Sequence, residues 1–269
     1  MSGARANTKL KGDITTMNIS IGITERGDAG IDLSWYEKLS NPKSKLSGAI
    51  LITKNLNDNF IAHVLQLHKS GIKLIVHATC TGYGGTQIEP NVPEPYWQLS
   101  QLQKLIHCGF PKEQCVLRLD PIIPTKNGIM VAKTILDTAT SLNLLPDMRI
   151  RISILDEYKH VKERFKEHGI PCNYTFFQPS NYMIYQLMDA LSEYPYTFEC
   201  CAEPKLTGTQ YKHIGCISKN DLDILHIAYE DMDINPQNRR GCLCLSCKRE
   251  LLSSKTQCPH KCLYCYWKN

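Results

Sequence analysis

The chain has 269 residues, of which 42% are apolar or aromatic and 21% are charged, a balance typical of a folded globular protein. This composition excludes a disordered or collagen-like chain, and the 13 cysteines are too few for a secreted disulfide scaffold. Residues 1–13 lack the pattern of a secretory leader, and apolar stretches such as 129–145 are interrupted by charges and too short to span a membrane. We therefore expect a cytoplasmic protein with reduced thiols and no membrane partner.

The formal net charge of +5 comes from the end of the chain. Residues 239–269 carry seven lysines and arginines against one acid, Glu250, together with six of the cysteines. Basic residues beside thiolates lower the thiol pKa and offset the negative charge of a metal–thiolate centre. The other interpretation is a solvated basic tail that binds nucleic acid weakly.

An apolar, β-branched run followed by an amphipathic helical stretch recurs along residues 17–203. The predicted strands are residues 17–23, 48–53, 73–78, 115–119, 149–155 and 197–201. The predicted helices are residues 33–39, 58–69, 96–108, 129–142, 158–168 and 179–192. Continuous apolar strands that alternate with helices favour a parallel sheet with covered faces. The sequence therefore predicts an α/β fold, a TIM-like parallel β/α barrel of about six units, partial or closed, with a flat doubly wound sheet as the alternative.

Polar residues directly follow the predicted strands, where a parallel barrel places its functional loops. They are Glu25 and Arg26 after the first strand, Thr53, Lys54 and Asn55 after the second, Tyr83 after the third, Arg118 and Asp120 at the fourth, Asp156 after the fifth, and Glu199 and Glu203 around the sixth. Each residue alone is typical of a turn or a helix cap, but their recurrence favours a shared site. The glycines at Gly82, Gly84 and Gly85 do not match a dinucleotide-binding fingerprint, so that function is excluded.

The strongest motif lies near the end of the chain, where Cys258, Cys262 and Cys265 follow the spacing CxxxCxxC. Three thiolates on one short loop can bind three irons of a 4Fe-4S cluster and leave the fourth iron open to a small chelating ligand. The spacing, with an aromatic residue before the last cysteine, resembles the signature of the radical S-adenosylmethionine (SAM) superfamily.

This resemblance implies a radical SAM enzyme, in which SAM binds the open iron, one electron cleaves its sulfonium, and a 5′-deoxyadenosyl radical abstracts hydrogen from a substrate. It also implies a partial or full β/α barrel and an electron donor such as flavodoxin or ferredoxin. The motif usually follows the first strand in that superfamily, so its position here implies a permuted arrangement. We expect a barrel core over residues 14–205 and a cysteine-rich C-terminal iron–sulfur extension over residues 206–269, which folds back on the barrel mouth to meet the substrate.

A closer resemblance is to a bacterial family in which a C-terminal CPHxCxYCY stretch follows similar strand-end motifs. The shared segments are Thr53-Lys54-Asn55, Asp120-Pro121, Cys201-Ala202-Glu203, Cys216-Ile217 and Cys242-Leu243-Cys244. The aromatic residues around the third cysteine of the motif are also similar to those of spore photoproduct lyase, which repairs a thymine dimer. The substrate class that we expect first is therefore a nucleobase, nucleotide or nucleic acid, and the second is a small metabolite or a peptide.

The resemblance also implies roles for single residues. Tyr264 occupies the position that lies near the adenine of SAM, and the triplet Thr53-Lys54-Asn55 replaces a Gly-Gly-Glu turn that often binds the methionine amino group. Charge and hydrogen-bonding chemistry assign the carboxylate and ribose contacts of SAM to Lys54, Arg118 and Asp120. The residues left to face the substrate are Glu25, Arg26, His77, Tyr83 and Asp156.

Four further cysteines indicate a second metal centre. They are Cys201, Cys216, Cys242 and Cys244. Their positions fit the cysteine positions of the resembled bacterial family, and we expect them to hold an auxiliary iron–sulfur cluster or a zinc ion. Cys247 is an alternative member of this set.

Two CxxC pairs provide the alternative function. They are Cys244 with Cys247 and Cys262 with Cys265, separated by 14 residues. This spacing is close to that of a zinc ribbon, and a zinc ribbon with basic flanks would bind nucleic acid without radical chemistry. We favour the iron–sulfur interpretation because the zinc ribbon leaves Cys242 and Cys258 without a role.

Overall fold

The computed structural model describes residues 19–171, 174, 177–229, 233–234, 241–252 and 258–267. Its elements in chain order are β1 (Ile21–Ile23), α1 (Ser34–Ser40), β2 (Gly48–Thr53), α2 (Asp58–Lys69), β3 (Leu74–Thr79), α3 (Pro95–His107), a 3-10 turn η1 (Lys112–Gln114), β4 (Cys115–Ile122), α4 (Lys126–Ser141), β5 (Arg149–Ile154), α5 (Lys159–Glu167), α6 (Asn181–Ser192), β6 (Phe198–Cys200), β7 (Tyr211–His213), α7 (Lys219–Ile224) and β8 (Lys248–Glu250). The predicted α/β class and the alternation of six strands with helices are confirmed. None of the helices in the described residues has the length and apolar character required to span a lipid bilayer.

The strands of the described residues form one parallel sheet in the order β7-β6-β5-β4-β3-β2-β1-β8. From β1 to β7 each new strand is added beside the previous one, without a reversal. Because β-α-β crossovers are right-handed, such an order sends the connecting helices to the same face of the sheet. The edges of the sheet are β7 and β8, and no pairing joins these two strands in the described part of the chain.

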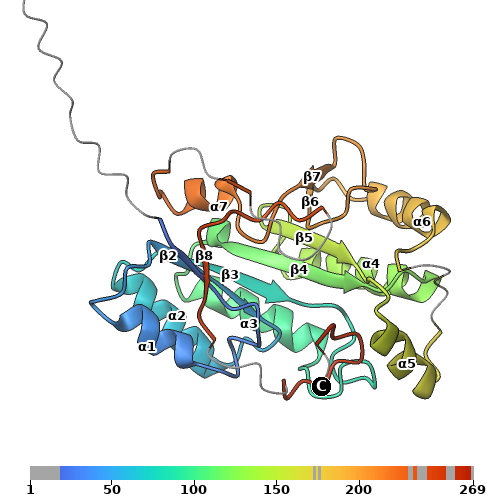
Figure 1. Ribbon diagram of the computed structural model, residues 1–269, viewed down its shortest axis with the longest axis horizontal. Helices are drawn as coiled ribbons and strands as arrows, with labels where there is room; N and C mark the ends of the chain where they lie inside the picture. The colour runs from blue at the N-terminus through green and yellow to red at the C-terminus, as the bar shows by residue number, and fades with distance from the viewer. Residues whose placement is uncertain are drawn as a thin grey trace, which may run out of the picture.

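Helices α1 to α4 and α6 pack against one face of the sheet. In Figure 1, α1 to α3 lie below the strands. Alternate strand residues such as Val76, Leu117 and Ile152 point to this face and are wholly buried there. Helices α2, α4 and α6 begin at capping side chains; Thr125, for example, accepts the backbone N–H of Gly128, so α4 starts earlier than the predicted residue 129. The helical face is therefore the main apolar core.

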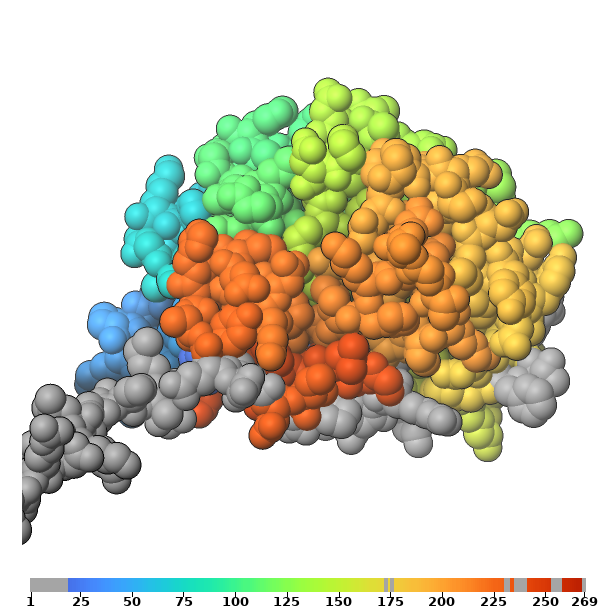
Figure 2. Space-filling model, turned by 90° about the horizontal axis from the view of Figure 1, so that it is seen from above, coloured from blue at the N-terminus to red at the C-terminus, as the bar shows by residue number. Residues whose placement is uncertain are grey.

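The opposite face of the sheet is apolar at one end and charged at the other. Ile50, Ile75 and Val116 pack against α7 and the residues that follow it, whereas His77, Arg118 and Arg151 occupy alternate positions of neighbouring strands and are also buried. Figure 2 looks onto this side and shows α7 and its neighbours, in orange, beside the redder residues that lead to β8. The C-terminal extension thus supplies two strands of the sheet, β7 and β8, and the helix that covers its second face.

The sequence analysis did not anticipate β7, α7 or β8. The strands β7 and β8 have three residues each and the polar sequences YKH and KRE, so neither has an apolar pattern. They form because the neighbouring strands β6 and β1 offer free backbone groups in the correct register.

Candidate functional site

The C-terminal motif, defined as Cys258, Cys262 and Cys265, lies on the loops at the carboxyl ends of the strands. The N–H of Leu263 donates to the carbonyl oxygen of Ile88 at 3.0 Å, and the Asn91 side chain donates to the carbonyl of Pro259 at 2.7 Å. On the other side, the Arg164 guanidinium donates to the carbonyl oxygens of Cys262 and Cys265. Loops after β3 and helix α5 therefore hold the motif over the strand ends.

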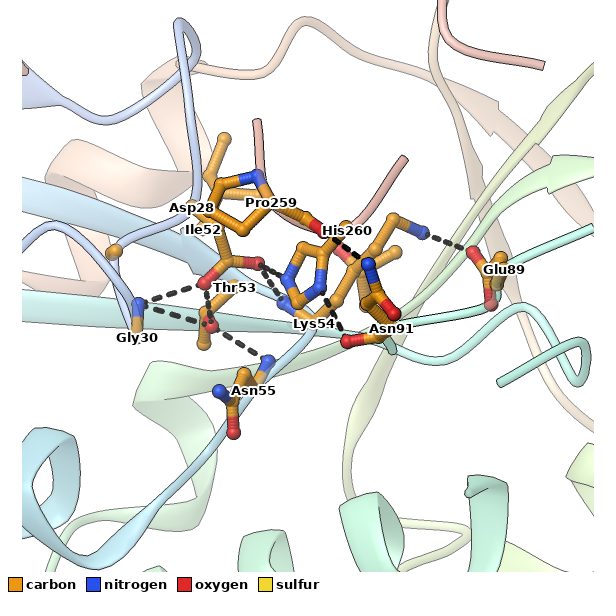
Figure 3. A network of polar contacts seen from close by, with 12 residues as sticks. Asp28, Gly30, Ile52, Thr53, Lys54, Asn55, Glu89, Asn91, Pro259 and His260 are labelled. Atoms are coloured by element: carbon orange, nitrogen blue, oxygen red, sulfur yellow. Dashed lines mark hydrogen bonds and ion pairs between the residues drawn. The ribbon is translucent and has the colours of Figure 1, made fainter. Parts of the chain in front are cut away.

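A buried Asp28–His260 pair joins the motif to the loop after β1 (Figure 3). The His260 Nε2 atom lies 2.9 Å from an Asp28 oxygen, and its Nδ1 atom lies 3.0 Å from the carbonyl of Asn91. Asp28 also accepts the Thr53 hydroxyl at 2.5 Å and the N–H of Lys54 at 2.6 Å. Burial opposes ionisation of Asp28, but His260 and these donors hold the pKa of its carboxyl below the ordinary value. The pair fixes the motif to the end of β2.

A second polar cluster lies beside Cys262. The Glu89 carboxylate is buried and accepts hydrogen bonds from Lys54 Nζ at 2.9 Å, from the Thr81 hydroxyl at 2.7 Å and from the Tyr264 phenol. Lys54 Nζ also lies 5.2 Å from the centre of the Tyr264 ring. Burial raises the pKa of the Cys262 thiol to about 12, and Lys54 opposes that rise. A positive charge and a negative charge therefore lie next to the central cysteine of the motif.

The structure brings some of the predicted SAM-binding residues to the motif and separates others. Thr53, Lys54 and Tyr264 lie beside it, whereas the Asn55 N–H donates to the Thr53 hydroxyl in the turn before α2. Arg118 and Asp120 pair with each other at the end of β4. The sequence analysis did not identify Asp28, Glu89 or His260; the histidine between two motif cysteines was the available signal.

The second group of thiols, which we call the four-cysteine site, is assembled from three separate segments. Its members are Cys201 after β6, Cys216 after β7, and Cys242 and Cys244 before β8. The Sγ atoms of Cys201 and Cys216 are 3.5 Å apart, and the Cys244 sulfur accepts the backbone N–H of Cys216 at 3.2 Å. Hydrogen bonds with Cys201 and Cys244 hold the pKa of the Cys216 thiol well below its ordinary value.

A network of buried ion pairs supports the segment that carries Cys216. Arg151 donates to the carbonyl of Cys216 at 3.2 Å and to Glu199 at 2.7 Å. Arg149 donates to Glu199 at 2.7 Å and to Asp221 at 2.7 Å, and Asp221 forms the capping box of α7. The network links β5, β6 and α7, which fixes the loop between β7 and α7 against the sheet.

The residues predicted to face the substrate are only partly gathered. Glu25 lies at the four-cysteine site, and burial together with the Cys216 charge raises the pKa of its carboxyl to about 7, against the effect of Lys248 at 2.6 Å. His77 is buried on the sheet, and burial with Arg151 and Arg118 nearby lowers its pKa, so its imidazole is neutral. Tyr83 packs against the C-terminal motif loop.

Arg26 lies on the loop after β1, and Asp156 lies on the loop after β5. Arg26 is exposed, and Asp156 is half-buried at the start of α5, where its carbonyl accepts the N–H of Tyr158 at 3.1 Å. Tyr266, in contrast, is about half exposed and packs near Tyr158, with ring centres 6.4 Å apart. Partial burial raises the pKa of its phenol, and the nearby charges of Glu25, Cys265 and Cys216 act in the same direction.

The remaining described cysteines lie elsewhere. Cys80, Cys115 and Cys200 belong to the core on the helical face, Cys108 is exposed, and Cys247 packs with the apolar cluster around α7. Cys172 lies outside the described residues. Cys247 is therefore in a different apolar cluster from Cys262 and Cys265. In a zinc ribbon, these three cysteines would have to lie together.

Comparison with known proteins identifies the family of the chain. Residues 33–267 match the family model described as "Domain of unknown function (DUF1848)", and the chain belongs to this family. Comparisons with curated proteins and with solved structures give no match.

Proposed function

We propose that this protein is a radical SAM enzyme whose cluster is bound by the C-terminal motif. The observation that carries the proposal is the position of three closely spaced cysteines at the carboxyl ends of parallel strands, next to the paired charges of Lys54 and Glu89. In parallel α/β folds this end of the sheet is where functional groups converge. The proposal includes a partial β/α barrel, in which β1 to β6 are the repeating units.

The donor set of the motif fits a 4Fe-4S cluster with one open iron. Cys262 is buried, while Cys258 and Cys265 are half-buried, so the loop is sheltered on one side and accessible on the other. Each thiolate adds negative charge, and Lys54 together with the Arg164 guanidinium offsets it. When bound, the cluster would supply the electron that cleaves SAM and so generates the 5′-deoxyadenosyl radical for hydrogen abstraction.

The neighbouring residues fit the polar groups of SAM. Lys54 and Glu89 offer one positive and one negative side chain, which complement the carboxylate and the ammonium of the methionine part. Tyr264 presents an aromatic ring beside them for the adenine. Arg118 and Asp120, a second pair of opposite charge, would orient the ribose or a carboxylate of the substrate.

The substrate would occupy the region between the two sulfur sites, which Glu25, His77 and Tyr266 border. A nucleobase, nucleotide or nucleic acid is the first substrate class, and a small metabolite or peptide is the second. Fluorescence anisotropy with a labelled single-stranded oligonucleotide separates them: the first class predicts binding that weakens steeply with salt, and the second predicts no binding.

The test of the proposed function is anaerobic purification followed by iron and sulfide quantification and a SAM cleavage assay with dithionite, a flavodoxin or a ferredoxin as electron donor. We expect iron, sulfide and formation of 5′-deoxyadenosine. The variant Cys262→Ala should lose cleavage, while Cys108→Ala, an exposed cysteine outside both sites, should keep it. Bound zinc without iron in the reconstituted protein, and no cleavage, would favour the zinc ribbon.

A further inference from the structure

Glu25, Cys216 and Cys244 bring a carboxylate and two thiols together at the four-cysteine site. We infer that these three residues bind one zinc ion, whose fourth position is open to water or to a donor atom of a substrate. The sequence analysis placed the two cysteines in a metal centre but assigned Glu25 to the substrate, so the carboxylate is a new ligand. The ion would be bound whether or not the protein cleaves SAM.

The ligand atoms of the three residues lie close enough for one ion. A carboxylate oxygen of Glu25 and the sulfurs of Cys216 and Cys244 are all within 4.8 Å of one another. In a tetrahedral site with Zn–S bonds of about 2.3 Å and Zn–O bonds of about 2.0–2.2 Å, neighbouring ligand atoms are about 3.5–3.8 Å apart. Each ligand atom therefore needs to move by about 1 Å or less to bind a common ion.

The mixed donor set favours zinc over a second iron–sulfur cluster. Zinc accepts thiolates and a carboxylate in one site, and three protein ligands leave its fourth position for water or substrate, whereas iron–sulfur clusters are held mainly by thiolates. Among the described residues, Cys201 and Cys242 are not part of the close group. The Cys201 sulfur lies 3.5 Å from the Cys216 sulfur, where its thiol can donate to a zinc-bound thiolate.

The backbone fixes the two thiols beside each other. A Cβ atom at Gly215 would lie 2.5 Å from both the Cα and the N atom of Cys244, so a side chain there would push the two segments apart. The N–H of Cys216 donates to the Cys244 sulfur at 3.2 Å, and the N–H of Leu245 donates to the carbonyl of Ile217 at 3.1 Å. Hydrogen bonds of this kind orient thiolate ligands.

The Glu25 carboxylate is held in a position that suits a ligand. Lys248 Nζ lies 2.6 Å from Oε2, so Oε1 can bind the ion while the lysine orients the side chain. Two thiolates and one carboxylate around Zn²⁺ leave one excess negative charge, which Lys248 and the buried Arg151 offset; Arg151 donates to the carbonyl of Cys216 at 3.2 Å. The Glu25 side chain is 27% exposed, so water or a substrate atom can reach the fourth position.

The location of the group indicates what the ion would connect. Cys216 follows β7 at one edge of the sheet, whereas Glu25 follows β1 and Cys244 precedes β8 at the other edge. One ion bound to all three would join two edges that no strand pairing closes in the described residues. Zinc binding displaces the thiol protons and would couple this connection to folding.

The first experiment measures metals in the full chain and in the triple variant Cys258→Ala/Cys262→Ala/Cys265→Ala, both purified anaerobically. Plasma mass spectrometry should find one zinc per chain in both proteins, and X-ray absorption at the zinc edge should find two sulfur neighbours at about 2.3 Å and lighter atoms at about 2.0–2.2 Å. Absence of zinc, iron with sulfide in the triple variant, or more than two sulfur neighbours would overturn the inference. SAM cleavage is not a readout, so the two proposals can fail separately.

Single variants separate the three ligands from the neighbouring cysteines. Glu25→Gln should weaken zinc binding by more than about 100-fold in competition with a chelator, because loss of a partner outside the ligand set already costs about 10- to 100-fold. Its matched control is Glu163→Gln, on the exposed side of α5. Cys244→Ala should leave one sulfur neighbour, and Cys201→Ala and Cys242→Ala should each leave two. Equal zinc affinity of Glu25→Gln and the control, with circular dichroism showing both folded, would contradict the carboxylate ligand.

Cobalt substitution tests the open position. Co²⁺ in place of zinc absorbs visible light, and its spectrum depends on the ligands. Azide, a small anion, should bind at the fourth position and shift the visible bands of the cobalt-loaded triple variant. An unchanged spectrum at saturating azide would mean that the protein itself fills this position, against the inferred coordination.

Discussion

The two thiol groups of this protein differ in how the chain assembles them. The C-terminal motif comes from eight consecutive residues, and polar contacts from the surrounding loops hold it in place. The four-cysteine site comes from three segments, and within it the Cys201 and Cys216 sulfurs lie 3.5 Å apart. In the motif, Cys258 and Cys265 are half-buried, whereas in the four-cysteine site Cys201, Cys242 and Cys244 are buried.

This difference fits two proposed uses of thiolates. An accessible loop with neighbouring charges suits a centre that must admit a ligand, and a mostly buried set of sulfurs suits a centre that supports the fold. Cysteine spacing along the chain therefore identifies only the first kind of site, in which one segment carries the thiols. The second kind is defined by which strands are neighbours in the sheet.

The largest effect should come from Arg151, which supports only the four-cysteine site. Arg151→Ala leaves buried carboxylates of Glu199 and Asp221 with less positive charge, and should lower the free energy of unfolding by about 3–5 kcal/mol. Urea denaturation measures this loss. The matched control Lys104→Ala breaks an exposed ion pair with Asp58 and should leave stability unchanged. Equal stability of the two variants would mean that the buried network does not support the site.

An intermediate effect should come from His260, which supports only the C-terminal motif. His260→Ala removes the contact with Asp28 and should weaken iron retention about 10- to 100-fold against a chelator. His107→Ala, on the exposed end of α3, is the control. Iron retention equal to that of the control would show that the Asp28–His260 pair does not support the motif.

The smallest effect should come from Tyr264. Tyr264→Phe removes the hydrogen bond to Glu89 but keeps the ring, and a hydrogen bond to a charged group is worth about 1.5–3 kcal/mol. We expect SAM to bind roughly 10-fold more weakly, as measured by isothermal titration of the reconstituted protein. The control is Tyr182→Phe, on the exposed side of α6. Unchanged SAM affinity would argue against a SAM site beside Glu89.

The sequence predicted the repeating part of the fold well, because β2 to β5 are apolar runs bounded by clear turns. It did not predict the short strands β7 and β8, whose positions depend on edges offered by strands far away in the sequence. Residues 17 and 18 of the first predicted strand lie outside the described residues, and Ile21–Ile23 pairs with both neighbouring strands.

The candidate site was predictable where one segment carries the chemistry. The C-terminal motif and the Thr53-Lys54-Asn55 triplet were identified from sequence, whereas Asp28 and Glu89 were not. Their loops have no distinctive pattern, and each carboxylate gains its partners only when the end of the chain returns to the strand ends. The prediction that four distant cysteines form a metal centre stays a prediction, although Cys216 lies close to Cys201 and Cys244 in the structure.

The pairing of β1 with β8 also orders the events of biosynthesis. Ile21 donates its N–H to the carbonyl of Cys247, and the N–H of Leu251 donates to the carbonyl of Ile23. A growing chain makes β1 early and folds from its N-terminal side as it emerges from the ribosome. The outer edge of β1 therefore stays open until residues 247–251 have been synthesised. Since the C-terminal motif follows β8 in the chain, it is synthesised only after the strand that completes this pairing.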